Sequence, residues 1–71
     1  MEHVPVQSTN IRSVGYDPET RTMQVQFSHG GLYSYSNVDP GVHQALVEAP
    51  SVGAHFTLNI RNNYAGERIG G

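Results

Sequence analysis

The segment that constrains the fold most is an unbroken alternation of polar and apolar residues from Thr22 to Ser28. Side chains of a β-strand point alternately to its two faces, so a period of two predicts a strand with one buried face and one wet face. The buried face would carry Met23, Val25 and Phe27. The chain is therefore expected to contain a sheet that needs a cover on one side.

Turn signals on both sides of this strand predict a meander of three antiparallel strands. Residues 17–20 read Asp-Pro-Glu-Thr, a sequence that favours a tight turn, and the Gly30-Gly31 pair tolerates the positive φ of a second reversal. The neighbouring strands are expected at residues 11–17 and 32–37.

The flanking segments extend this prediction. Strict alternation in the first strand would place Val14 and Tyr16 on one face and Ile11 on the other. Residues 1–10 are polar and are expected to form an extended lead-in. The third strand is short and could lie at an edge of the sheet, where it would accept a strand from another protein.

From Val38 onward the apolar residues follow the period of a helix. The pair Asp39-Pro40 is typical of a helix start, because aspartate caps free N–H groups and proline is tolerated at the first helical position. The first helix would bury a face spaced i, i+3, i+4 and i+7, made of Val42, Ala45, Leu46 and Ala49. Pro50 ends this helix, and Ser51 is expected to cap a second one. The apolar face of the second helix has four-residue spacing and consists of Val52, Phe56 and Ile60.

The predicted fold class is therefore α+β, a three-stranded antiparallel meander covered on one face by two C-terminal helices, with residues 1–71 as a single domain. The expected core consists of Met23, Val25, Phe27, Leu46, Phe56 and Ile60. The tail after the second helix is polar, with Tyr64 and Ile69 as expected anchors onto the body.

The chain has 71 residues and no cysteine. A domain of this size buries only about 60 % of its unfolded surface, and neither a disulfide nor a thiolate metal site is available to stabilise it. We therefore expect a homo-oligomer. The N-terminus lacks the basic start and apolar run of a signal peptide, and no segment approaches the ~18 apolar residues of a membrane span, so a cytoplasmic protein is expected.

The charge balance limits the partners. Four arginines and no lysine face six acidic residues, for a net charge of −2. A protein that grips a nucleic acid duplex through many phosphates needs a broad basic surface, which this composition does not supply. A local cationic patch is the most that the chain can offer.

Several short motifs occur in a characteristic order along the chain. They are Ser-Thr-Asn-Ile at 8–11, Val-Gly-Tyr-Asp at 14–17, Tyr-Ser-Tyr at 33–35, Ala-Pro-Ser at 49–51, and a closing pattern of Gly53, Phe56, Ile60, Arg61, Tyr64 and Arg68. In this order and spacing they resemble the KTSC domain family, over residues 6–69. The resemblance implies a protein of bacterial or phage type, because KTSC domains occur alone in bacteria and phages and at the C-terminus of some lysyl-tRNA synthetases.

The same resemblance implies RNA binding and supplies no set of catalytic residues. Two departures weaken the RNA interpretation. The chain has His-Phe-Thr at residues 55–57 where the family often has Tyr-Phe-Asn, and its last helix is less basic than is usual for the family.

The strongest candidate ligand site consists of Arg61, Tyr64 and Arg68. Arginine forks bind phosphate oxygens in pairs, and a neighbouring tyrosine can stack on a base. The alternative is that the arginines stabilise the end of the second helix and pair with Glu48 or Glu67. Asn59, followed by Asn62 and Asn63, adds amides that either read a base edge or end the helix.

Tyr33 and Tyr35 share one face of the third predicted strand. One interpretation is a stacking platform, worth ~1–3 kcal/mol per base in single-strand binders. The other is that both rings pack under the helices with their hydroxyls at the edge. Both interpretations remain open from the sequence.

Neither catalysis nor metal binding is predicted. The four histidines, at 3, 29, 43 and 55, have no ligand-type spacing, so we expect no metal and no cofactor. His43 is expected to face solvent on its helix. Ser8 and Ser51 are explained by a turn and a cap, and so short a chain is expected to offer little concavity.

The sequence therefore predicts a small non-enzymatic binding module. Its expected ligand is RNA or a small nucleotide, including the case of a phage-type oligomer that traps a nucleotide signal. The alternative is a protein–protein interaction or accessory domain that uses the sheet edge or the tyrosine face.

Overall fold

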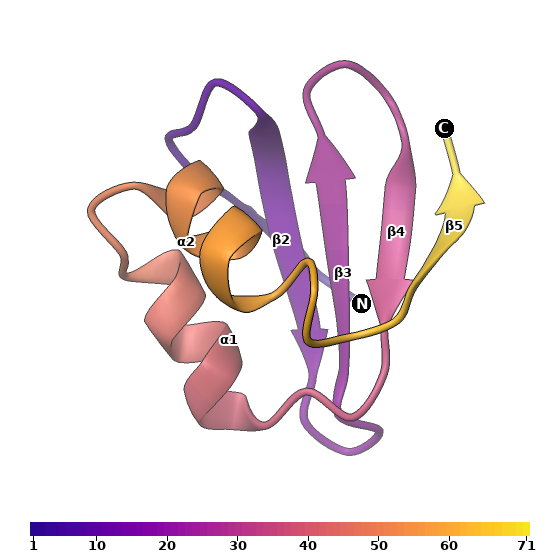
Figure 1. The fold of residues 1–71 in the computed structure, drawn as a ribbon. Coiled ribbons are helices and arrows are strands. Elements are labelled where there is room, and N and C mark those ends of the chain that lie inside the picture. The colour runs from indigo at the N-terminus through magenta and orange to yellow at the C-terminus, as the bar shows by residue number, and fades with distance from the viewer.

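The computed structural model describes residues 1–71 and consists of a five-stranded antiparallel sheet with two helices on one face (Figure 1). The strands lie in chain order: β1 His3–Pro5, β2 Ile11–Asp17, β3 Thr22–Phe27, β4 Leu32–Tyr35 and β5 Gly66–Gly70. The helices α1, Pro40–Val47, and α2, Val52–Asn59, lie between β4 and β5 in the chain. The α+β class and the central meander are confirmed, whereas the expected number of strands, three, is wrong.

The two missed strands lie at the two edges of the sheet. β1 has only three residues and ends at Pro5, and β5 is bounded by Gly66 and Gly70, so neither shows an apolar alternation. Their pairing with β2 and β4 is what makes them strands. Because β4 is paired on both sides, the expectation that the third predicted strand lies at an edge is wrong. Ile69 is 48 % exposed and does not anchor the tail, whereas Tyr64 packs against the core.

A β-bulge changes the faces of β2. Ile11 pairs with Phe27 and Ser13 with Gln26, so Arg12 is an extra residue in the ladder. Strict alternation had placed Ile11 and Val14 on opposite faces. The bulge lets both side chains enter the core. Tyr16 is only partly buried.

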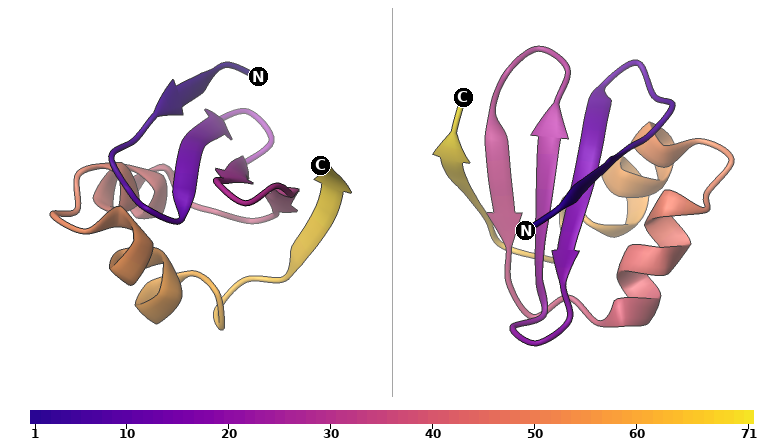
Figure 2. Two further views of the ribbon diagram at one scale, coloured as in Figure 1. Left: turned by 90° about the horizontal axis from the view of Figure 1, so that it is seen from above. Right: turned by 180° about the vertical axis from the view of Figure 1, so that it is seen from behind.

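The N-terminal strand lies on the side of β2 that faces away from the helices, as both views of Figure 2 show. His3 fixes it there: its Nδ1 is 3.0 Å from the Ser13 hydroxyl and its Nε2 is 2.9 Å from the Gln24 amide oxygen. A Cβ at Gly15 would lie 2.7 Å from the His3 ring, so glycine is required beneath it.

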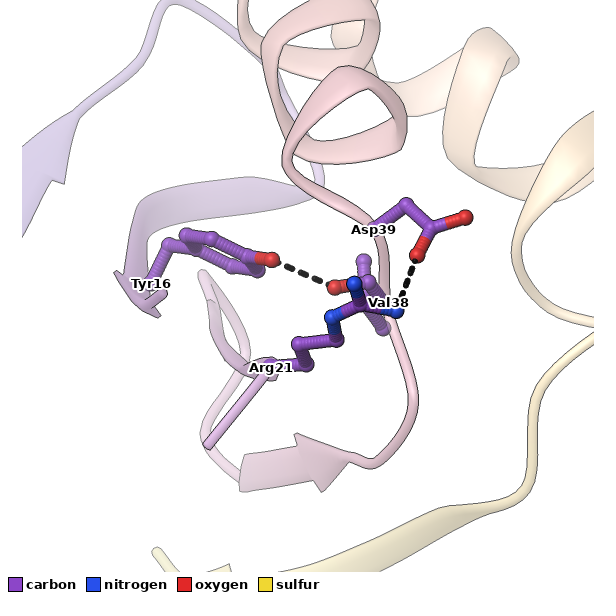
Figure 3. Close-up of polar contacts among 4 residues, drawn as sticks. All are labelled: Tyr16, Arg21, Val38 and Asp39. Carbon is purple, nitrogen blue, oxygen red and sulfur yellow. Dashed lines mark hydrogen bonds and ion pairs between the residues drawn. The ribbon is translucent and has the colours of Figure 1, made fainter. Parts of the chain in front are cut away.

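The two helices start differently. Ser51 caps α2 as expected, since its Oγ accepts a hydrogen bond from the Ala54 N–H at 3.4 Å. Asp39 stands at the N-cap of α1 but makes no side-chain cap bond. Instead it pairs with Arg21 at 2.8 Å, while the Tyr16 hydroxyl donates to the Val38 carbonyl (Figure 3).

The core lies between the central strands and the helices. Its ten buried members are Ile11, Val14, Met23, Val25, Tyr35, Val38, Leu46, Val52, Phe56 and Ile60. Two expectations fail: Phe27 is only partly buried and Ala45 is exposed. Neither helix has the length and apolar character that a membrane crossing requires.

Candidate functional site

An open cleft of about 900 Å³ lies between the helix-bearing face of the sheet and α2. Its walls are Thr9 and Asn10 before β2, the β3–β4 turn at residues 28–31, one face of α2, and β5. In Figure 1 the connection after α2 crosses in front of the sheet to reach β5, which brings both ends of this connection to the cleft. The expectation of little concavity is therefore wrong.

The floor of the cleft is aromatic. Phe27 is in edge-to-face contact with Tyr33, Phe56 and His29, at ring-centroid distances of 5.5, 5.4 and 5.8 Å. Tyr35 makes a further edge contact with Phe56 at 5.7 Å. All five rings line the cleft, and their mutual packing holds the floor in one arrangement.

Two arginines line the cleft from opposite sides. Arg61 follows the end of α2, and Arg68 lies in β5 directly opposite Tyr33, so both of these side chains share the helix-bearing face of the sheet. Both arginines are exposed. Glu67 pairs with Ser34 and therefore belongs to the other face of β5.

Neither cleft arginine is neutralised by an acidic side chain. The structure contains one ion pair, between Arg21 and Asp39, so of the two alternatives the pairing with Glu48 or Glu67 does not form. The Arg68 Nε donates to the Gly70 carbonyl at 3.3 Å. No aspartate or glutamate lines the cleft, so this concavity is positive although the chain is acidic.

Tyr35 belongs to the structure of the floor. It is 5 % exposed, and burial raises the pKa of its hydroxyl, with Tyr33 adding to the rise and Arg61 opposing it. A Cβ at Gly66 would lie 2.5 Å from the Tyr35 ring, so β5 approaches the ring closely because it has no side chain there. The interpretation of Tyr35 as a packed ring is confirmed, while Tyr33 is half-buried at the floor.

The structure divides the predicted ligand site in two. The cleft contains Arg61, Arg68, Tyr33 and Tyr35. Tyr64 and Asn59 instead line a separate depression between α1 and α2, where the Asn59 amide donates to the His55 carbonyl at 3.2 Å.

Sequence reasoning missed part of the cleft. Phe27 and Phe56 were predicted only as core residues, which holds for the buried Phe56, and His29 was given no role in a ligand site. The signal for Phe27 was its position at the end of β3, next to the Gly30-Gly31 turn, where a strand leaves the cover of the helices.

His43 is also placed differently from the expectation. It stacks on Tyr16 with ring centroids 4.7 Å apart and planes 8° apart, and it is half-buried instead of facing solvent. Burial lowers the pKa of His43 below 6.5. No three histidine, aspartate or glutamate side chains gather in a way that could hold a metal ion.

These features define a small α+β domain with one cationic cleft over an aromatic floor. The KTSC domain family model matches residues 7–64, and the chain belongs to this family. The resemblance drawn from the motifs is thereby confirmed.

Similar proteins include both short chains and much longer ones. An uncharacterized protein from Stutzerimonas stutzeri is 54 % identical over 56 residues, which cover 79 % of each chain. A lysine–tRNA ligase from Nostoc punctiforme is 34 % identical over 59 residues, which cover 83 % of this chain and 10 % of the ligase. The crystal structure of a KTSC domain protein from Yersinia pestis superimposes with a TM-score of 0.93 at 36 % identity, covering 97 % of both chains.

Proposed function

We propose that this protein is a non-enzymatic module that binds a small nucleotide in the cleft. The observation that carries the proposal is the pair Arg61 and Arg68, which face a cleft with an aromatic floor and no acidic residue. Guanidinium forks match phosphate oxygens, and aromatic rings offer a surface for a base. A ligand that combines an anion with a flat ring satisfies both features.

The size and surroundings of the cleft favour a small ligand over an RNA strand. Its volume of about 900 Å³ falls within the range typical of small-molecule sites. All six acidic residues lie outside the cleft. The surface outside it carries only two arginines, Arg12 and Arg21, and is therefore acidic. An RNA strand leaving the cleft would meet no continuous basic surface. RNA is the alternative ligand, because some relatives of this chain are named lysine–tRNA ligase.

Binding without catalysis is supported by the lining. The cleft contains one histidine, His29, and no carboxylate that could orient it or act as a base. Ser28 and Thr57 also line the cleft, but no histidine–carboxylate pair is present to activate either hydroxyl as a nucleophile.

Nucleotide binding is tested by a thermal-shift panel of mono- and dinucleotides, followed by calorimetry on the best ligand. A ligand at 100 times its Kd should stabilise the fold by about 2.7 kcal/mol. Arg61→Gln and Arg68→Gln should each weaken binding about 10- to 100-fold, because each removes a charge-assisted hydrogen bond.

Arg12→Gln is the matched control, since Arg12 is exposed on β2 and outside the cleft, and it should leave the affinity unchanged. Equal losses of affinity in all three variants would show that binding depends only on the net charge of the protein, and would contradict a site at the cleft arginines. Absence of binding by every nucleotide, or tight RNA binding that falls steeply with salt, would contradict the proposal.

A further inference from the structure

The cleft does not end at α2. A side groove of about 590 Å³ runs between residues 7–10 and the N-terminal half of α2. It shares four lining residues with the cleft: Thr9, Asn10, Gly53 and Thr57. The two concavities therefore adjoin across these four residues, and a ligand longer than a nucleotide could reach from one into the other.

The side groove differs from the cleft in its chemistry. It has no charged lining residue. Hydroxyl and amide groups come from Gln7, Ser8, Thr9, Asn10, Ser51 and Thr57, and apolar surface comes from Pro50, Val52, Ala54 and Leu58. Some of these groups are used within the fold. The Ser8 Oγ accepts from the N–H groups of Asn10 and Ile11, the Ser51 Oγ caps α2, and the Thr57 hydroxyl donates to the Gly53 carbonyl at 3.0 Å.

Three of the side chains have no such role. Gln7, Thr9 and Asn10 are exposed, and their side chains make no hydrogen bond to the rest of the chain. Their donors and acceptors are free for a ligand. They lie on a short segment that is tied to β3, because the Ser28 N–H donates to the Asn10 carbonyl at 2.9 Å.

This mixed lining of polar groups and apolar side chains, the latter including Val52 and Leu58, suits a neutral group that presents both hydroxyls and C–H surface. A charged group would find no counter-charge in the side groove. A wholly apolar group would cover the apolar part of the lining but would exclude water from the hydroxyls and amides without replacing their hydrogen bonds, which is unfavourable. A sugar ring presents the matching donors and acceptors.

The side groove and the cationic cleft are linked along α2. Gly53 and Thr57 are four residues apart on one face of α2 and line both concavities, and Arg61, just beyond the end of the helix, lines the cleft. A phosphate held by Arg61 would therefore lie in the cleft, whose border with the side groove is formed by Gly53 and Thr57.

We infer that the ligand is a nucleotide whose phosphate carries a neutral sugar, with the nucleotide in the cleft and the sugar in the side groove. This inference rests on the proposed function and adds the chemical class of the ligand. The base is left to the experiment, since the floor offers only ring faces and edges.

Two ligand pairs test the inference by calorimetry: ADP against ADP-ribose, and UDP against UDP-glucose. Within each pair the second member carries an added neutral sugar on the terminal phosphate, which as a diester has about one negative charge fewer near neutral pH, so a gain in affinity cannot come from added charge. In at least one pair, the member with the sugar should bind about tenfold more tightly, the effect of one or two added hydrogen bonds. The pair that shows the gain identifies the base.

A variant that fills the side groove tests whether the sugar binds there. Ala54 is exposed on α2 and lines the side groove, so Ala54→Trp should remove the gain from the sugar and leave binding of the bare diphosphate unchanged. Ala45→Trp, at an exposed position on α1 outside both concavities, is the matched control and should keep the gain. Thr9→Val, a change of similar volume, should reduce the gain without affecting the fold.

The outcomes separate this inference from the proposed function. Equal affinities within both pairs, or a gain that survives Ala54→Trp, would overturn the sugar inference while arginine-dependent nucleotide binding stands. Failure of all four ligands and of the wider nucleotide panel to bind would overturn both.

Discussion

Gly66 determines how closely β5 approaches the floor of the cleft. Its Cα lies against Tyr35, and an added Cβ would be 2.5 Å from the ring Cε1 and 2.9 Å from Cζ. Tyr35 cannot move away easily, because its ring is buried and packs on Phe56. The position of Arg68, two residues further along β5, therefore depends on a residue without a side chain.

Gly66→Ala is expected to destabilise the fold by about 1–3 kcal/mol, the usual effect of overpacking a filled site. Gly41→Ala is the matched control. Gly41 lies in the first turn of α1 with nothing within 4 Å of a built Cβ, so this change should stabilise the fold by about 0.4–1 kcal/mol. Urea unfolding of both variants measures the difference. Equal effects of the two substitutions would contradict the close approach at Gly66.

Six ligand residues were predicted from residue types and motifs, and four of them line the cleft. Arginines and tyrosines were identified by their chemistry, which does not require a three-dimensional structure. The sequence allowed Tyr64 either to anchor the tail onto the core or to join the arginines at a ligand site. It could not show that Tyr64 packs on the core while Arg61, three residues earlier, faces the cleft. That separation arises from the turn after α2, where the N–H groups of Asn63 and Tyr64 both donate to the Ile60 carbonyl.

At the scale of elements, α1 is held to the sheet by an aromatic stack. Tyr16 on β2 stacks on His43 of α1, and the Tyr16 hydroxyl donates to the Val38 carbonyl just before the helix (Figure 3). Burial lowers the pKa of His43 from 6.5, so the folded protein holds the neutral imidazole. The packing of α1 is therefore sensitive to pH.

The sign of that sensitivity follows from proton uptake. As the pH falls below 6.5, the unfolded chain protonates His43 before the folded protein does, so stability is full above this pH and declines as the pH falls through the lower folded-state pKa. His43→Phe keeps a stacking ring and removes the titration. The stability difference between His43→Phe and the unmodified protein should shift in favour of the variant between pH 7.5 and pH 5, measured by urea unfolding. A difference that does not change with pH would contradict the assignment.

The elements with strong local periodicity could be predicted, and those that depend on pairing could not. Thr22–Phe27 alternates without a break, and a serine cap follows Pro50, so β3 and the start of α2 were recognised from local patterns. β5 consists of exposed residues between two glycines and becomes a strand only because the chain returns to β4 after the helices. The bulge at Arg12 likewise depends on the register with β3.

At the scale of the whole molecule, charge is sorted between the cleft and the remaining surface. Arg61 and Arg68 line the cleft, and every acidic residue lies outside it. Such an arrangement concentrates an anionic ligand at one place and discourages a long polyanion elsewhere on the surface. A homo-oligomer stays a prediction from the small size of the chain.

The most direct test of nucleotide binding is a titration of the ¹⁵N-labelled protein with the best nucleotide, followed by amide NMR spectra. The amide shifts should concentrate at the cleft, at Gly31, Tyr33, Arg61 and Arg68. In Arg68→Gln they should require about 10- to 100-fold more nucleotide, whereas Arg12→Gln should titrate like the unmodified protein. Shifts confined to the depression lined by Asn59, Asn63 and Tyr64, or no shifts with any nucleotide, would contradict the account.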